Sequence, residues 1–384
     1  MSTTVMHAEA EVCTFVEALR HLPDDRDNRG KRHALVFVVV GVIGAILSGR
    51  AKVSSIFRYI RNRIDWLREV THHPEAGVIS RAHLPRLLAR MPWTELNTLI
   101  DTHFGLQVAL RAEQGWVAID GKVLRGTLTA GDKQAVVLAI RHGSRSLVAH
   151  APMRGSKASE IPVVRALLKA SGLEKHNVPL DAHHCNPTTT AQIQQAGGQY
   201  VLQVKANQPL LLQQCQDIAA TWEPRSSHTE SEKGHGRLTT RIGRCFDMRG
   251  VPMAARWSDS GLHTLVVMQR ETVTLATQHT TQETAYYISN YVLSSDPQPP
   301  AIALTGAIRE HWHVEADNWI RDVTLEEDHV TTTSANQAHI MASLRSVALH
   351  VLRRCGVTNF RAALEDFADC PSKFEAVLRQ VNFL

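Results

Sequence analysis

The sequence is poor in the residues that would commit it to disulfides or to a cysteine-based metal site. Its six cysteines are scattered, with no Cys-x-x-Cys pair and no zinc-like spacing. His183, His184 and Cys185 stand together, but no second ligand pair lies at the required spacing, so we expect a polar loop there. We therefore expect a reduced, cytoplasmic chain. The first residues also lack the basic and apolar regions of a signal peptide.

A membrane-spanning stretch is lacking as well. The uncharged apolar run at residues 34–47 would reach about 21 Å as a helix. This length falls short of the roughly 30 Å hydrocarbon core of a membrane. We expect a buried helix at the centre of an N-terminal domain, and no membrane partner.

A strong charge bias is missing too. The formal net charge is +5, with 43% hydrophobic and 21% charged residues, which is ordinary for a soluble globular protein. The length of 384 residues suits two or three domains. The mild basicity permits a nucleic-acid partner without requiring one.

The segment 50–68 concentrates basic side chains. Its charged and aromatic residues are Arg50, Lys52, Phe57, Arg58, Tyr59, Arg61, Arg63, Asp65, Trp66 and Arg68. Two interpretations remain open. The arginines could contact the DNA backbone, where each neutralised phosphate releases counterions. Alternatively, the segment is an amphipathic helix with a solvated basic face.

The pattern of apolar residues divides the chain into four segments. Residues 1–112 are predicted to be helical, 113–221 to hold strands and helices, 222–300 to be a β-rich insertion, and 301–384 to be helical again. Within the second segment the order is three strands, helix, strand, helix, strand, which predicts a mixed sheet with helices on its faces. This is the order of the RNase H-like fold. We therefore predict an α/β protein with an RNase H-like catalytic core after an all-helical N-terminal domain.

Two aspartates end predicted strands of this core. Asp120 follows the apolar strand 116–119, and Asp181 ends the strand 178–181. Because the first and fourth strands of an RNase H-like sheet lie side by side, we expect the two carboxylates to be close together. Carboxylate oxygens suit Mg²⁺ or Mn²⁺, and two-metal phosphodiester chemistry requires a cluster of acids.

A third acid is expected from the helix that begins near residue 301. Glu315 shares a helical face with His311 and Trp319, whereas the acidic run 326–328 is more typical of a solvated turn. For each carboxylate alone, the plain alternative is a helix cap or a surface salt bridge. The strand order and the helix together favour a shared site.

Short motifs in a fixed order cover nearly the whole chain. They include 119–126 (IDGKVLRG), 157–161 (KASEI), 180–183 (LDAH), 200–208 (YVLQVKANQ), 235–237 (HGR) and 309–315 (REHWHVE). Each motif is weak alone, but the ordered set is specific. It resembles bacterial insertion-sequence transposases of the ISAs type, also called H-repeat-associated proteins, within the DDE superfamily.

The resemblance implies an activity, a cofactor and partners. Asp120, Asp181 and Glu315 would be the catalytic triad, with two Mg²⁺ or Mn²⁺ ions. The enzyme would cleave double-stranded DNA at the ends of an insertion sequence and join them to target DNA, as a homodimer on paired ends in the bacterial nucleoid. The residues expected to contact DNA are Lys122, Arg125, Lys205, Asn207, Gln208, Arg237 and Arg309, with Arg58, Arg61 and Arg63 of the basic segment.

The chain also departs from the family pattern. Residues 316–319 (ADNW) replace an Asn followed by Leu-His-Trp, and residues 329–333 (HVTTT) replace a commonly basic stretch. Two alternatives therefore stay open. One is a domesticated or decayed copy that binds DNA without catalysis, and the other is a metal nuclease without strand transfer.

Overall fold

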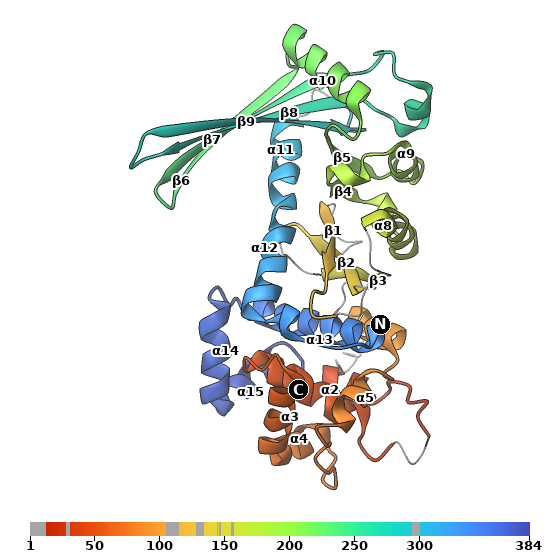
Figure 1. Ribbon diagram of the computed structural model, residues 1–384, viewed down its shortest axis with the longest axis vertical. Coiled ribbons are helices and arrows are strands. Elements are labelled where there is room, and N and C mark those ends of the chain that lie inside the picture. Colours follow the sequence, from red (N-terminus) through yellow and green to blue (C-terminus); the bar gives the residue numbers. More distant parts are fainter. Residues whose placement is uncertain are drawn as a thin grey trace, which may run out of the picture. The chain divides into compact units, whose positions relative to one another are not determined.

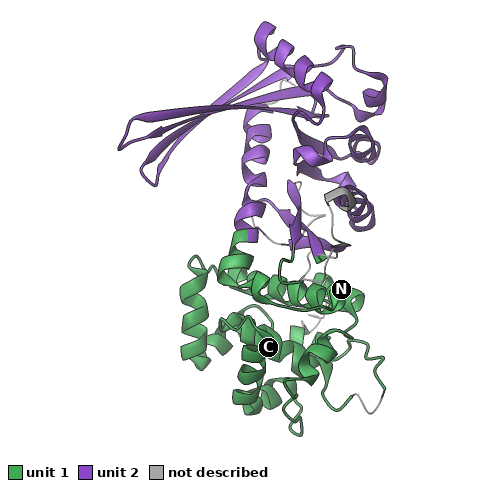
Figure 2. Cartoon of the chain, viewed as in Figure 1, with its two compact units in different colours: residues 1–106, 124–134, 319–384 green, residues 107–123, 135–318 purple. Residues whose placement is uncertain are grey.

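The chain folds into two compact units (Figures 1 and 2). The computed structural model describes residues 13–27, 31–104, 115–127, 134–143, 145, 147–154, 157–293 and 300–384. One unit comprises residues 1–106, 124–134 and 319–384 and is called here the helical unit; the other comprises residues 107–123 and 135–318 and is called the sheet unit. Both units combine residues that are far apart in the sequence. The two units do not test the boundaries of the four predicted sequence segments, which remain a prediction.

The helical unit contains the N-terminal and C-terminal helices. Its α-helices are α1 (Phe15–Leu19), α2 (Leu35–Leu47), α3 (Val53–Asn62), α4 (Ile64–Thr71), α5 (His83–Leu88), α6 (Trp93–His103), α13 (Ala335–Arg354), α14 (Phe360–Asp369) and α15 (Pro371–Gln380). The predicted helical N-terminal region is therefore confirmed.

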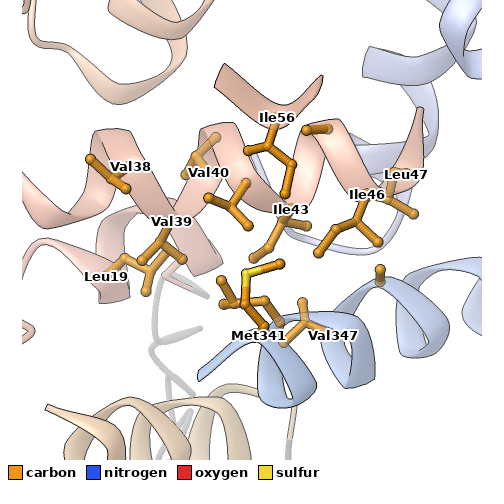
Figure 3. Close-up of a cluster of buried hydrophobic side chains, with 14 of the residues drawn as sticks. Leu19, Val38, Val39, Val40, Ile43, Ile46, Leu47, Ile56, Met341 and Val347 are labelled. Atoms are coloured by element: carbon orange, nitrogen blue, oxygen red, sulfur yellow. The ribbon is translucent and has the colours of Figure 1, made fainter. Parts of the chain in front are cut away.

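Helix α2 is the centre of this unit. All of its residues are buried, and Val39, Ile43 and Leu47 pack in one hydrophobic cluster with residues of α3 and α13 (Figure 3). Gly41 and Gly44 let α3 approach closely. A Cβ at Gly41 would lie 2.8 Å from Ile60 Cγ1, and one at Gly44 would lie 2.9 Å from the Tyr59 hydroxyl oxygen. The buried helix expected at residues 34–47 is confirmed. Within the described residues, no helix has the length and apolarity to cross a membrane.

The basic segment 50–68 forms two helices rather than one. Helix α3 ends at Asn62, and α4 begins at Ile64. Its aromatic residues face the core: Tyr59 is buried, and Phe57 and Trp66 pack against the cluster around α2. Arg50, Arg58 and Arg61 are exposed, as an amphipathic pattern predicts, whereas Arg63 and Arg68 are half-buried.

The sheet unit contains the strands. Its elements are β1 (Val117–Val123), β2 (Gln134–Arg141), β3 (Leu147–Arg154), α8 (Lys157–Ser171), β4 (Asn177–Leu180), α9 (Pro187–Gln195), β5 (Gln199–Val204), α10 (Pro209–Thr221), β6 (Ser226–Gly234), β7 (Arg237–Asp247), β8 (Thr264–Thr274), β9 (His279–Ser289), α11 (Pro300–His311) and α12 (His313–Trp319). The mixed α/β sheet of the prediction is confirmed.

Two sheets meet along β1 and β4. The first has the order β1-β2-β3, and the second has the order β4-β5-β9-β8-β7-β6. A parallel bridge between Trp116 and Asn177 joins them. The predicted adjacency of the first and fourth strands is therefore confirmed.

The β-rich segment continues the second sheet. Strands β7, β8 and β9 lie in the segment 222–300 that was predicted to be β-rich, and β9 pairs directly with β5. The predicted insertion therefore extends the core sheet (Figure 1). Strand β6 lies at the edge of this sheet and was not predicted, because its sequence SSHTESEKG is polar throughout. Pairing with β7 stabilises it instead of burial.

Two details of the sequence prediction are wrong. Asp120 does not end its strand, because β1 continues through Val123 and pairs Gly121 with Val137 of β2. Gly121 therefore occupies a paired position in an extended strand. The helix predicted from residue 301 to 320 is broken at Trp312, which lies between α11 and α12.

Candidate active site

Asp120 and Asp181 lie at the same level of two neighbouring parallel strands. Trp116 and Asn177 form the bridge between the two strands. Asp120 lies four residues after Trp116, and Asp181 lies four residues after Asn177. Asp181 directly follows β4, as predicted, whereas Asp120 lies within β1. The two carboxylates are therefore close together because of the parallel register of the strands, and not because both strands end there.

Local hydrogen bonds orient Asp181. It is the N-cap of a short 3-10 helix, Ala182–His184, and its Oδ1 accepts hydrogen bonds from the backbone N–H groups of His183 (2.9 Å) and His184 (3.4 Å). The plain cap alternative is thus realised. These bonds occupy one carboxylate oxygen, and the side chain stays exposed to solvent.

The loop after Asp181 is tied down from two other elements. Asn207 Nδ2 donates to the Ala182 carbonyl (2.7 Å), and Gln208 Nε2 donates to the Cys185 carbonyl (2.8 Å). Both residues follow β5. The structure therefore gives these two predicted DNA contacts a local role in holding the Asp181 loop.

Glu160 anchors the same loop from α8. Its Oε1 lies 3.0 Å from Nε2 of His184, and both side chains are buried. Glu160 also packs against β1, since a Cβ at Gly121 would lie 2.7 Å from its Cδ. Only a glycine leaves room for this carboxyl group beside Asp120. Glu160 thus contacts both β1 and the loop that follows Asp181.

Helix α12 brings a third acid to the aspartates. Asn318 Nδ2 donates a 3.0 Å hydrogen bond to Asp120 Oδ2. Glu315 lies one helical turn earlier, and residues three apart on a helix share a face. The break at Trp312 starts this helix immediately before Glu315, whose N–H donates to the Trp312 carbonyl.

The site gathers negative charge around Asp120. Burial, followed by the charges of Glu160 and Asp181, raises the pKa of Asp120 to about 6, and Glu315 contributes in the same direction. A raised carboxyl pKa means that the ionised form is disfavoured. A bound cation would relieve this strain by attracting the same charges.

A pocket of about 140 Å³ opens beside these acids. It is lined by residues that include Asp181, Lys205, His311, Trp312 and Glu315. Burial lowers the pKa of His311 to about 4, although Asp181 acts in the opposite direction. His311 is therefore neutral near pH 7 and neither neutralises Asp181 nor repels a cation. Lys205 is exposed and supplies a positive charge at the same pocket.

The donor set suits a hard divalent cation in kind. Mg²⁺ prefers carboxylate oxygens, is bound by one or two carboxylates, and keeps several waters. Within the described residues, no group of three or more His, Cys, Asp or Glu side chains is arranged to hold a metal ion as it stands. Metal binding therefore requires side-chain adjustment around Asp120, Asp181 and Glu315.

The remaining predicted DNA contacts of the sheet unit differ in accessibility. Lys122 is 4% exposed, so burial does not favour a direct phosphate contact there. Arg237 is exposed beside the β6–β7 turn. The Arg309 guanidinium contacts Glu230 (3.0 Å) and Glu232 (2.7 Å) of β6, so a phosphate would have to compete with two carboxylates.

The helical unit holds the other predicted contacts. Arg125 is exposed, and its Nε lies 3.7 Å from Asp328 Oδ2. Arg58 and Arg61 lie on the exposed side of α3, and the Arg61 guanidinium lies 5.8 Å from the centre of the Phe57 ring. Arg63, between α3 and α4, donates to the Ala368 carbonyl (3.4 Å).

Part of the acidic run 326–328 is not a solvated turn. Glu327 is buried and lies 3.3 Å from the guanidinium of Arg321. Arg321 also donates to Ser346 Oγ of α13 (2.5 Å). Pairing with a buried arginine inside the helical unit gives Glu327 a structural role.

Two residues at the site were missed by the sequence prediction. Glu160 had no signal beyond its place in the KASEI motif, because its contact with His184 spans 24 residues of sequence. Asn318 stood in a stretch noted only as a departure from the family. Its spacing of three from Glu315 was the available signal, since that spacing places both side chains on one helical face.

Comparison with known proteins bears on the origin of this arrangement. Residues 16–104 match the family described as DDE_Tnp_1-associated. The chain is 26% identical to the H repeat-associated putative transposase YhhI of Escherichia coli (strain K12), over 92% of this chain and 93% of that protein. The resemblance to H-repeat-associated transposases is confirmed.

Other relatives agree with this similarity. The chain is 23% identical to the putative transposase YncI of Escherichia coli O157:H7, over 89% of this chain and 88% of that protein. It is 26% identical to the putative protein YbfL of Escherichia coli (strain K12), over 92% of this chain and 93% of that protein. These similarities extend over nearly the whole chain and support a transposase-related function.

Proposed function

We propose that this protein is a DDE transposase with an RNase H-like core. It cleaves DNA at the ends of an insertion sequence and transfers them to target DNA. Asp120, Asp181 and Glu315 are its catalytic triad. The observation that carries the proposal is the gathering of Asp181, Glu160 and Glu315 around Asp120, on neighbouring parallel strands and a helix bonded to them through Asn318.

The strand arrangement supports the RNase H-like assignment. Strand β1 lies beside β4, and the two aspartates occupy the same level of the parallel pair. A helix late in the chain, α12, then supplies Glu315 and the hydrogen bond of Asn318 to Asp120. This combination of two strand carboxylates and one helix carboxylate suits two-metal phosphodiester chemistry.

Asp120, Asp181 and Glu315 would hold two Mg²⁺ or Mn²⁺ ions. Such ions activate the attacking oxygen and stabilise the leaving oxygen of a phosphodiester. Asn318 orients Asp120, while the backbone bonds of residues 183 and 184 orient Asp181. Lys205 lies at the same pocket, where its ammonium can pair with a phosphate of the bound strand.

The partner of this site is double-stranded DNA, from both the element ends and the target. We propose that two copies act together on paired ends, because joining both ends to one target needs two active sites. The supporting observation is the family similarity, since the relatives are named as transposases. The proposed cellular site is the bacterial nucleoid.

The direct test is nicking of DNA that carries the cognate terminal repeats. We expect Mg²⁺-dependent nicking by the wild-type chain, and a loss of at least about a hundredfold in Asp120→Ala, Asp181→Ala and Glu315→Ala. The exposed Asp259→Ala, elsewhere in the sheet unit, is the matched control and should retain activity. If all three site variants nick as fast as wild type, the triad is assigned wrongly.

A second candidate function is DNA binding without catalysis. It is favoured by the departures of residues 316–318 and 329–333 from the family pattern. Sequence-specific binding without cleavage under either Mg²⁺ or Mn²⁺ would support this candidate. Joined donor–target products would exclude it, and would also exclude a nuclease that lacks strand transfer.

A further inference from the structure

The helical unit contains a pocket that is lined by arginines and, among the described residues, by no acid. The cavity has a volume of about 370 Å³, and its lining residues are Ser48, Arg50, Ser55, Arg58, Tyr59, Asn62, Arg63 and Ala368. This volume lies within the range of small-molecule sites in proteins. We propose that this arginine pocket binds a phosphate group, supplied by the DNA backbone that the proposed function requires.

The pocket follows from helical spacing. Ser55, Arg58 and Asn62 recur at intervals of three and four on α3, so they share one face. Tyr59 lies beside them and turns its ring toward α2. The hydroxyl and amide groups on this face are the kinds of side chain that accompany arginine in phosphate contacts.

A buried serine lines the same cavity. Ser48 is 4% exposed, and within the described residues its Oγ makes no hydrogen bond of good geometry. Burial raises the pKa of the neighbouring Tyr59 phenol, and a side-chain hydrogen bond with Ser48 acts in the opposite direction. A ligand oxygen in the pocket would give the Ser48 hydroxyl a better-placed partner.

Two of the arginines are free to serve a ligand. Arg50 and Arg58 are exposed, and within the described part of the chain their guanidinium groups make no hydrogen bond or ion pair. Arg63 is already held by its bond to the Ala368 carbonyl, which fixes part of the pocket wall. Guanidinium groups always carry their charge and match phosphate oxygens with paired donors.

The neighbouring cavity is a contrast within the same unit. It shares Ser48, Arg50 and Ala368 with the arginine pocket, but acids such as Glu326 and Glu365 line it as well. Its mixed charge does not favour an anion. The arginine pocket is distinguished from it by Arg58 and Arg63, and because none of its described lining residues is an acid.

Arg61 provides a matched control on the same helix. Its guanidinium lies over the Phe57 ring, and Nε donates to Asn62 Oδ1 (3.3 Å). It does not line the pocket. On a diffuse basic surface, Arg58 and Arg61 would contribute equally to DNA binding. In a discrete phosphate site, Arg58 contributes and Arg61 does not.

The first experiment measures binding of the full chain to duplex DNA by fluorescence anisotropy across a salt series. The buffer contains EDTA, so that the result is independent of metal-dependent nicking. For each phosphate that a variant no longer neutralises, the slope of log K against log salt falls by about 1. We expect that reduction in Arg58→Gln, and an unchanged slope in Arg61→Gln.

The second experiment uses inorganic phosphate as the probe. Phosphate at matched ionic strength should raise the Tm of the wild-type chain relative to chloride, because a ligand of the folded state stabilises it. Arg58→Gln should lose this increase. Ser48→Ala should lower the increase while leaving the Tm in chloride unchanged or higher, which a purely structural serine would not do.

The outcomes separate the two sources of phosphate. A slope reduction specific to Arg58→Gln assigns the pocket to the DNA backbone. A phosphate-dependent Tm increase that needs Arg58, with unchanged DNA slopes, assigns it to a free phosphate or phosphate ester. Equal slope reductions in Arg58→Gln and Arg61→Gln, or no effect of either probe, would overturn the pocket. Absence of nicking on terminal-repeat DNA would leave these outcomes unaffected.

Discussion

The carboxylate site of the sheet unit and the arginine pocket of the helical unit concentrate charges of opposite sign. The carboxylates can respond by taking up a proton, and the pKa of Asp120 is accordingly raised to about 6. Arginines have no such response, because a guanidinium stays protonated in proteins. Arg50 and Arg58 accordingly remain exposed to water. A cluster of acids can thus be partly buried before its ligand arrives, whereas arginines without a carboxylate partner stay in solvent.

The largest expected effect is on stability near the acids. The folded-state pKa of Asp120, about 6, lies above its ordinary value of 3.8. The native state therefore binds the proton more tightly than the unfolded state, and metal-free stability falls as the pH rises from about 4 through 6. Asp120→Asn should be more stable than wild type at pH 7 by up to about 3 kcal/mol. At a pH of about 3.5, below both pKa values, the two proteins should be equally stable. Urea unfolding in EDTA measures the difference.

Asp101 is the control for this effect within the helical unit. Burial alone raises the pKa of Asp101 to about 7, so Asp101→Asn should also stabilise the chain at high pH. The two positions should differ in their response to Mg²⁺. Mg²⁺ should reverse the loss of stability that ionised Asp120 causes, and it should leave the loss caused by ionised Asp101 unchanged. If Mg²⁺ changes the effect of neither substitution on stability, Asp120 does not differ from Asp101 in binding a cation.

The next effect concerns the orientation of Asp120. Asn318→Ala removes the 3.0 Å hydrogen bond to its carboxylate, and hydrogen bonds to charged groups contribute about 1.5–3 kcal/mol. We expect nicking to slow by about ten- to a hundredfold. Ala316→Ser, on an exposed position of the same helix, should have no effect. Full activity in Asn318→Ala would show that the bond does not position Asp120 for reaction.

The smallest effect should come from Glu160. Glu160→Gln removes the charge that ranks after burial among the causes of the Asp120 shift, but retains an oxygen for the contact with His184. The pKa of Asp120 should fall, and the pH at which nicking reaches half its maximum should fall with it, by less than about one unit. Glu160→Ala should additionally lower the Tm, because it leaves the buried His184 without its carboxylate. An unchanged pH profile in Glu160→Gln would mean that Glu160 acts only as a support.

Local patterns predicted the acids better than they predicted the acids' surroundings. Asp181 was recognisable because it follows an apolar strand, and its neighbour Asp120 because strand order implies adjacency. Asp120 was nevertheless placed at a strand end, since a glycine after an aspartate resembles a turn. The contact between Glu160 and Gly121 depends on the packing of α8 against the sheet, which sequence spacing does not encode.

The arginine pocket was less visible in the sequence. The basic residues of segment 50–68 were apparent, and two interpretations stayed open. Arg58 lines the pocket and Arg61 does not. This difference depends on the break after Asn62, on the inward-facing aromatic side chains and on Ser48 at the end of α2. None of these depends on neighbouring residues alone. Strand β6 was missed for a similar reason, because its polar sequence is stabilised by pairing across the sheet.

The central claim is that Asp120, Asp181 and Glu315 hold divalent metal. Calorimetric titration of Mn²⁺ into the wild-type chain at a pH of about 6, in buffers of different ionisation enthalpy, tests it most directly. We predict saturable binding of two ions with release of protons from the site, and loss of that signal in Asp120→Asn and Asp181→Asn. Absence of binding by the wild-type chain, or unchanged binding in both variants, would contradict it.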